Sequence, residues 1–147
     1  MPSQFQYHVR PAEWARDEAA IANLRREVFI VEQHVPESLE WEAEDAQHLW
    51  FVAESRLGLV GIARLTAKGR IGRMAVRRPF RGKGVGTDLL LAALAVARRG
   101  GMTRIYLSAQ THAEGFYARQ GFVAEGDVYL DAGIPHRTMY LDLKERE

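Results

Sequence analysis

The amino-acid sequence predicts an α/β fold, in which a mixed sheet of about seven strands is flanked by about four helices. The first observation is the order of the periodic segments: strand, helix, three strands, helix, strand, helix and two strands. The second is composition, because 47% apolar and 27% charged residues are ordinary for a soluble globular chain. The third is continuity, because the 147 residues contain no repeat or linker, which predicts one domain over residues 1–147.

The first half of the chain is assigned from residue spacing. Phe5 to Val9 alternates apolar and polar residues and predicts a strand, whereas Ala12 to Gln33 has apolar residues near helical spacing and predicts a helix that ends before Pro36. The acidic segment Glu37 to Gln47 is predicted to be a loop with a helical turn. Three strands are predicted next, joined by turns at Gly58 and Lys68-Gly69: His48 to Glu54, Leu59 to Leu65 and Ile71 to Val76.

The second half begins with a helix from Thr87 to Arg99, which is apolar on almost every face and is stopped by Gly100-Gly101. Such a helix must be covered on more than one side. The remaining predicted elements are a strand at Arg104 to Ala109, parallel to the third strand of the preceding group, a short helix at about Ala113 to Gln120, and strands at Phe122 to Leu130 and Arg137 to Leu143.

The segment from Arg70 to Asp88 contains a strand, a basic glycine-rich loop and the start of an apolar helix. Gly82, Gly84 and Gly86 let the backbone turn sharply and bring its N–H groups close to a ligand. Those N–H groups lie at the positive end of the helix dipole, so the loop predicts an anion site, most plausibly for phosphates. The Walker pattern and the dinucleotide-binding pattern both fail to match.

The pattern that does match is Arg-x-x-Gly-x-Gly, formed by Arg81, Gly84 and Gly86. With the order of elements, it resembles the GNAT superfamily of acyl-CoA-dependent N-acyltransferases. The segment Phe116 to Phe122 is similar to that family's [LF]-Y-x-x-x-G-F element. Two shorter phrases resemble the small bacterial ElaA-type subgroup: Val28 to Gln33 and Gly133 to His136.

The resemblance implies a V-shaped splay between strands four and five, and acetyl-CoA as co-substrate. It also implies transfer of the acetyl group to a primary amine by direct attack in a ternary complex. The loop amides would hold the coenzyme pyrophosphate, and the splayed strand would pair with the pantetheine arm like an added strand. The residues implied in coenzyme binding are Met74, Ala75, Val76, Arg81, Gly82, Lys83, Gly84, Val85, Gly86, Thr87, Gln110 and Tyr117.

Catalytic roles follow from the same resemblance. The backbone N–H of Met74 is the predicted oxyanion donor, and Tyr117 is the predicted general acid for the leaving thiolate. The structural alternative is that Tyr117 is only a core aromatic residue of a short helix. The general base stays open among His34, His48, His112, His136, Glu32 and the acids from Glu40 to Asp45; His136 and Glu32 lead, because they lie in the subgroup-like phrases.

Charge is unevenly distributed along the chain. Between Arg64 and Lys83 there are eight basic residues and no acid, whereas Glu37 to Asp45 contains five acids and no base. This pattern suits an anionic coenzyme beside a cationic substrate, if the acidic segment faces the site, or equally two solvated surfaces of opposite sign. The acceptor is expected to be a small-molecule amine or a protein amine.

Several other classes are disfavoured. A net charge of +1 and a basic run whose only aromatic residue is Phe80 argue against nucleic-acid binding. The chain has no cysteine, its histidines show no short ligand spacing, and no metal site is predicted. The absence of an apolar run long enough for a bilayer predicts a cytoplasmic protein with no membrane role, as a monomer or homodimer. A non-catalytic coenzyme-A-binding regulatory module remains the alternative function.

Overall fold

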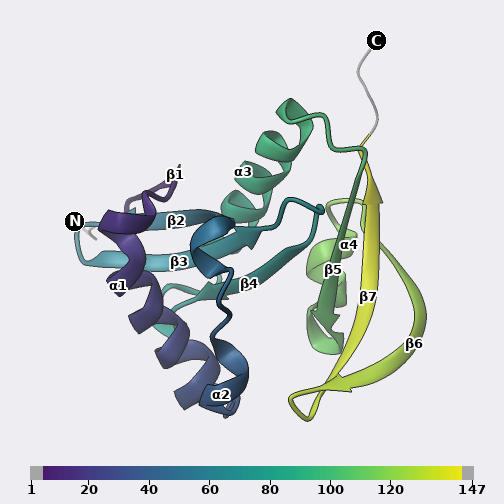
Figure 1. Ribbon diagram of the computed structural model, residues 1–147, viewed down its shortest axis with the longest axis horizontal. Helices are drawn as coiled ribbons and strands as arrows, with labels where there is room; N and C mark the ends of the chain where they lie inside the picture. The colour runs from purple at the N-terminus through teal and green to yellow at the C-terminus, as the bar shows by residue number, and fades with distance from the viewer. Residues whose placement is uncertain (1–4, 144–147) are drawn as a thin grey trace.

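The computed structural model describes residues 5–143, whose helices and strands are shown in Figure 1. The strands are β1 (Tyr7–Pro11), β2 (Leu49–Ser55), β3 (Gly58–Leu65), β4 (Ile71–Val76), β5 (Arg104–Gln110), β6 (Val123–Asp131) and β7 (Ile134–Asp142). The α-helices are α1 (Trp14–Arg25), α2 (Glu37–Glu40), α3 (Val85–Arg99) and α4 (Glu114–Ala118). The π-helix η1 (Arg26–Glu32) extends α1, and short 3-10 turns are η2 (Asp45–Gln47), η3 (Arg78–Phe80) and η4 (Thr111–Ala113).

The strands form two antiparallel sheets that meet at one point. The first sheet has the order β1-β2-β3-β4, and the second has the order β5-β7-β6. Within the described residues, β4 and β5 are joined only near their starts, by a parallel bridge between Arg70 and Tyr106 in which the Tyr106 N–H donates to the Gly69 carbonyl at 3.0 Å. Beyond this bridge β4 and β5 diverge (Figure 1), which confirms the predicted splay between strands four and five.

Helices α1 and α3 cover opposite faces of the first sheet (Figure 1). The reason lies in the alternation of β2, because successive side chains of a strand point to opposite faces. Trp50 and Val52 pack against α1, whereas Phe51 and Ala53 pack against α3. Helix α3 also contacts residues of the second sheet, such as Ile105, and this double packing explains why it is apolar on most faces.

Several predicted boundaries differ from the structure; the last strand, predicted from Arg137, begins at Ile134, so Pro135 and His136 lie in β7 and not in the connecting turn. The predicted helix from Ala12 to Gln33 changes its winding, since residues 26–32 are π-helical and the Gln33 N–H donates to the Val28 carbonyl at 3.0 Å. Hydrophobic spacing does not distinguish a π-helical turn from an α-helical one. The first strand lies two residues later than predicted, because β1 pairs with β2 from Tyr7 through Pro11.

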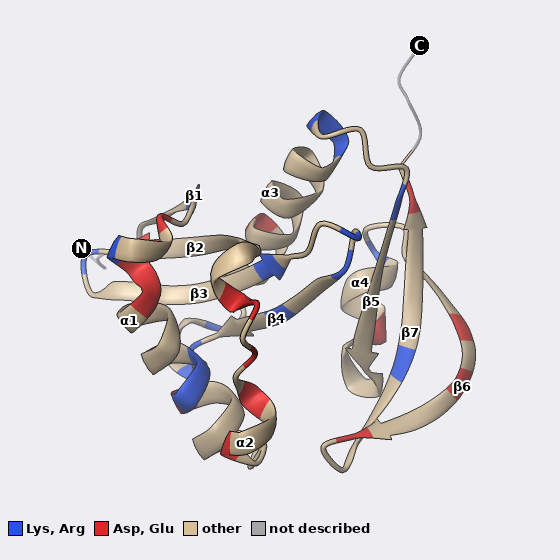
Figure 2. Ribbon diagram, viewed as in Figure 1, with Lys and Arg blue, Asp and Glu red and all other residues tan. Residues whose placement is uncertain are grey.

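Residues of the basic and acidic segments form ion pairs inside the protein instead of two separate surfaces. Figure 2 shows where the basic and acidic positions lie along the ribbon. Asp45 pairs with Arg64 at 3.2 Å and with Arg25 at 2.8 Å, and Glu40 pairs with Arg73 at 3.3 Å. Glu40 and Asp45 are buried, so their charges are largely compensated by arginines. The expectation that the whole acidic segment faces a cationic substrate is therefore wrong for these two carboxylates.

Candidate active site

The glycine-rich loop presents unpaired backbone N–H groups at the start of α3. Gly82 and Gly84 have φ angles of 78° and 87°, a left-handed conformation that side chains disfavour. Within the described residues, no hydrogen bond to protein is made by the N–H groups from residue 82 to residue 87, and the first N–H that pairs is that of Asp88, to Gly84 at 3.1 Å. The loop is therefore built to surround an anion with main-chain donors.

This loop borders a cavity of about 470 Å³ that lies between β4, the start of α3 and α4. Gly86 is packed closely there, because a Cβ at this position would lie 3.4 Å from the Phe116 ring. The lining residues that were predicted to bind the coenzyme are Met74, Ala75, Val76, Arg81, Gly82, Gly84, Val85, Gly86, Thr87 and Tyr117. Lys83 does not line this cavity and is exposed beside it.

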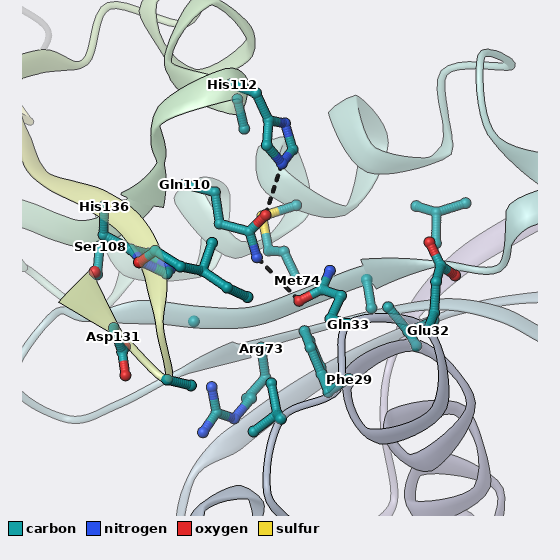
Figure 3. Close-up of a pocket in the computed structure, with 18 of the residues that line it drawn as sticks. Phe29, Glu32, Gln33, Arg73, Met74, Ser108, Gln110, His112, Asp131 and His136 are labelled. Atoms are coloured by element: carbon teal, nitrogen blue, oxygen red, sulfur yellow. Dashed lines mark hydrogen bonds between the residues drawn. The ribbon is translucent and has the colours of Figure 1, made fainter.

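A second cavity, of about 530 Å³, lies on the side of η1 and the β6–β7 turn and is shown in Figure 3. It shares Arg81, Ala113, Tyr117 and the segment Met74–Val76 with the first cavity. The two spaces therefore meet at the splayed edge of β4. A molecule bound in one reaches the same backbone segment as a molecule bound in the other.

The free edge of β4 faces this junction. The Arg77 N–H donates to the Val60 carbonyl of β3 at 2.9 Å, whereas the Val76 carbonyl accepts from Arg81 Nε at 2.7 Å. Because backbone groups along a strand alternate in direction, the N–H groups of Val76 and Met74 point away from β3 and into the gap. The predicted oxyanion donor thus belongs to an open strand edge.

A β-bulge lies next to Met74. Between the pairs Ile62–Ala75 and Arg64–Gly72, β4 advances by three residues (75 − 72) and β3 by two (64 − 62). The bulge contains Arg73, whose φ of 48° is unusual for a non-glycine residue. Such a conformation costs about 1 kcal/mol, and it is found most often where local backbone geometry serves a site.

Tyr117 projects from α4 to the junction of the cavities. Its hydroxyl lies 3.7 Å from the Met74 sulfur, and its ring packs edge-on against Phe116 and Phe122. Burial raises the pKa of Tyr117 to about 12. The hydroxyl therefore stays protonated at neutral pH and is available as a proton donor.

Gln110 connects η1 to the loop after β5, as the dashed lines in Figure 3 show. Its amide nitrogen donates to the Gln33 oxygen at 3.0 Å, and its oxygen lies 2.7 Å from His112 Nε2. Gln110 lines the second cavity but does not line the loop cavity. The structure thus gives its amide side-chain partners other than Tyr117.

His136 is buried in the wall of the second cavity. Its Nδ1 lies 2.6 Å from the Ile134 carbonyl oxygen, and its ring stacks on Tyr129 with 6.1 Å between centroids. A carbonyl oxygen only accepts hydrogen bonds, so Nδ1 carries the ring proton. Nε2 is left with a lone pair, which is the form required of a proton acceptor.

Glu32 lines the same cavity but is held in a two-pronged ion pair by Arg81, at 2.6 and 2.8 Å. The hydrogen bond from Arg81 lowers the pKa of Glu32, which weakens it as a proton acceptor. Arg81 donates to both the Glu32 carboxylate and the Val76 carbonyl, so its guanidinium connects η1 with β4.

The other candidate bases separate by position. His112 lines the second cavity, whereas His34, His48 and the acids from Glu40 to Asp45 do not. Two groups at the site were not singled out from the sequence. Arg73 was predicted only as one of the eight basic residues between Arg64 and Lys83, and Tyr7, whose hydroxyl donates to the Asp88 carboxylate at 2.5 Å beside the loop, carried no sequence signal.

A main-chain anion loop, an open strand edge and a second cavity that shares this edge define the chain, with its fold, as an acyltransferase. The acetyltransferase (GNAT) domain family matches residues 12–143. The chain belongs to this family.

Curated and solved relatives agree with this membership. The chain is 35% identical over 123 residues to the uncharacterized N-acetyltransferase YjcF of Bacillus subtilis, covering 81% of this chain and 88% of that protein. An acyl-CoA N-acyltransferase of Pseudomonas aeruginosa has 33% identity and a TM-score of 0.81, with 93% of this chain and 99% of that chain covered. Escherichia coli ElaA has 26% identity and a TM-score of 0.83, with coverage of 92% and 99%, so ElaA-like relatives are confirmed.

No helix among residues 5–143 combines the length and apolar character needed to cross a bilayer.

Proposed function

We propose that the protein transfers an acetyl group from acetyl-CoA to a primary amine, by direct attack of the amine in a ternary complex. The observation that carries this proposal is the junction of the two cavities at Met74–Val76 and Tyr117. A thioester entering from the loop side and an amine entering from the η1 side reach the same strand edge. No covalent intermediate on the protein is needed for such a reaction.

The loop side suits the coenzyme. The free N–H groups from residue 82 to residue 87 would bind the pyrophosphate, and the exposed Lys83 adds positive charge nearby. The pantetheine arm has amide groups, which would pair with the outward N–H and C=O groups of β4 as an added strand does. The divergence of β5 leaves room for this pairing.

The Met74 N–H would stabilise the negative charge that develops on the thioester oxygen. By the alternation along β4 it points away from β3 toward the gap between the sheets, and the bulge at Arg73 lies next to it. A preorganised donor of this kind typically contributes about 3 kcal/mol to lowering the barrier. Because the donor is backbone, replacing the Met74 side chain tests it poorly.

Tyr117 would protonate the departing thiolate. A free thiol has a pKa of about 8.5, whereas burial raises the pKa of Tyr117 to about 12. The phenol therefore remains protonated at neutral pH until the tetrahedral intermediate breaks down. Its O–H would hydrogen-bond to the sulfur and supply a proton as the C–S bond breaks and negative charge develops there, which favours expulsion of the thiol over return of the amine.

His136 is the best-supported general base. Its Nε2 lone pair, fixed by the Nδ1 contact with Ile134, can take a proton from the incoming ammonium or from the attacking amine, directly or through water. Glu32 fits this role less well, since Arg81 already neutralises it. Histidine also has an ordinary pKa close to neutrality.

The test is release of free thiol from acetyl-CoA against a panel of primary amines, with mass spectrometry of the acetylated acceptor. We expect thiol release that depends on both acetyl-CoA and an amine. Tight coenzyme A binding without release for any amine would favour the non-catalytic coenzyme-A-binding module. A protein that does not bind coenzyme A would overturn both readings.

A further inference from the structure

Arg73 is the one described residue of β4 whose side chain brings a cation into the second cavity. Behind the guanidinium, Nε forms an ion pair with the Glu40 carboxylate at 3.3 Å but no hydrogen bond, and the group sits 5.5 Å from the centroid of the Phe29 ring. Glu40 is itself fixed, because Arg25 Nε donates to it at 2.7 Å. These contacts orient the Arg73 side chain without using its terminal nitrogens.

The two terminal nitrogens of Arg73 make no hydrogen bond to any other residue in the described part of the chain. Figure 3 shows the guanidinium among the side chains that line the cavity, below Ser108 and Gln110. A planar fork of N–H donors with no protein partner matches the paired oxygens of a carboxylate. Burial also lowers the pKa of Arg73, which means that its charge has lost water contacts that an anionic ligand would replace.

Glu40 contacts Arg73 at Nε only, and the acids that line the cavity are either paired or exposed, so the terminal nitrogens of Arg73 stay available. Glu32 is occupied by Arg81 and lies 3.6 Å from Arg78. Asp131, at the tip of the β6–β7 turn, is the other acid in the cavity wall, and it is exposed, so water screens its charge. Arg73 is the more buried group, with 26% of its side chain exposed, and its field in the cavity is screened less.

We infer that the acceptor is an amine that also carries a carboxylate, and that Arg73 binds this carboxylate while the amine lies toward Met74 and Tyr117. This inference rests on the proposed acyl transfer and narrows its acceptor from primary amines in general to amino acids and related compounds. It replaces the expectation of a cationic substrate beside the acidic segment, because Arg25, Arg64 and Arg73 pair with the buried carboxylates of that segment.

The first experiment compares acids with their carboxamides in the thiol-release assay. The pairs are glycine and glycinamide, β-alanine and β-alaninamide, and γ-aminobutyrate and γ-aminobutyramide. A charged fork contact is expected to raise kcat/KM for the acid of the best pair by about tenfold to a hundredfold over its amide. Equal values for acid and amide in all pairs, or faster reaction of the amides, would overturn the inference and leave acyl transfer standing.

The second experiment changes the fork. Arg73→Lys keeps the positive charge but cannot form the bidentate contact, and Arg73→Gln removes the charge. Both are expected to raise KM for the acid severalfold or more and to reduce the ratio of kcat/KM for the acid to kcat/KM for its amide, with the glutamine variant affected most. Arg64→Lys is the matched control, because Arg64 belongs to the same buried ion cluster but does not line the cavity.

The third measurement does not depend on turnover. Titration calorimetry of coenzyme-A-loaded protein with N-acetyl-β-alanine is expected to show binding that is lost with Arg73→Gln and retained with Arg64→Lys, and that N-acetyl-β-alaninamide does not show. This result without any thiol release would support the carboxylate site and remove the acyltransferase proposal. Equal binding of acid and amide, or no binding of either together with no acid preference in turnover, would remove the carboxylate site.

Discussion

The hydroxyl of Tyr117 lies 3.7 Å from the sulfur of Met74, at the place where the loop cavity and the second cavity join. The pairing brings an edge strand and a short helix, 43 residues apart in sequence, to one point. In the proposed reaction the Met74 N–H acts on the carbonyl oxygen of the thioester and the Tyr117 hydroxyl acts on its sulfur. The two residues must therefore lie close together.

Replacing Tyr117 by phenylalanine tests its role as the proton donor. Tyr117→Phe is expected to lower kcat by about a hundredfold, because the leaving thiolate loses its proton donor. Coenzyme A affinity, measured by calorimetry, should stay near wild type, since the ring contacts with Phe116 and Phe122 are kept. Tyr106→Phe is the matched control, because Tyr106 packs on Tyr140 and lines neither cavity. An unchanged kcat in the Tyr117 variant would remove it from the mechanism.

The loop is tested by adding one methyl group. Gly84→Ala places a Cβ on a backbone with φ of 87°, at a cost of about 1 kcal/mol, and disturbs N–H groups that would face the pyrophosphate. We expect a loss of coenzyme A affinity of at least about tenfold. Gly58→Ala meets a comparable strain, with φ of 100° and open space around the Cβ, but lies in a remote hairpin. If both variants bind coenzyme A equally well, the loop is not the pyrophosphate site.

His136 is tested through the rate of acyl transfer. His136→Gln is expected to lower kcat/KM by about a hundredfold, because the proton acceptor is gone. His48→Gln is the control, since His48 lies outside the second cavity. A His136 variant with a wild-type kcat/KM would return the role of base to His112 or to water.

A stability prediction concerns Asp17, which anchors the first turn of α1. Its carboxylate accepts from Arg10 at 2.8 and 2.9 Å and from the Glu13 N–H at 2.8 Å. The hydrogen bond from Arg10 lowers the pKa of Asp17 below its ordinary value of 3.8. Its stabilising contribution is therefore complete above pH 3.8 and disappears as pH falls through the lowered pKa.

Asp17→Asn is accordingly expected to lower the free energy of unfolding by about 2 kcal/mol at neutral pH. The difference from wild type should shrink in acid below the ordinary pKa of 3.8. Urea titrations at neutral and acidic pH measure both values. A difference that stays constant with pH would show that the charge of Asp17 is not what stabilises the helix start.

Much of the fold followed from the sequence because it depends on local spacing. The short apolar run from Ile71 to Val76, the glycines after it and the apolar helix from Thr87 to Arg99 were each visible in a short window, and all three appear where predicted to within two residues. The π-helical winding of residues 26–32 was not predictable, since it depends on how the segment meets the sheet.

The candidate site was less accessible to sequence reasoning, because its electrostatics depend on contacts between distant segments. Arg81 was predicted to add charge at the phosphate loop, yet its guanidinium is bound to Glu32, 49 residues away in the chain. Glu40 was assigned to an acidic surface, yet it is buried beside Arg25 and Arg73. Pairing of this kind decides which charges remain free, and only the tertiary structure reveals it.

Among residues 5–143, the bridge between Arg70 and Tyr106 is the only strand pairing that joins the two sheets, and this has a mechanical consequence. The two sheets are joined at this bridge, and the facing edges of β4 and β5 diverge beyond it. A ligand that lies between β4 and β5 like an added strand would contact both sheets, so its binding is expected to make their relative position more rigid. The difference in melting temperature with and without coenzyme A would measure how much the bound coenzyme stabilises the folded protein.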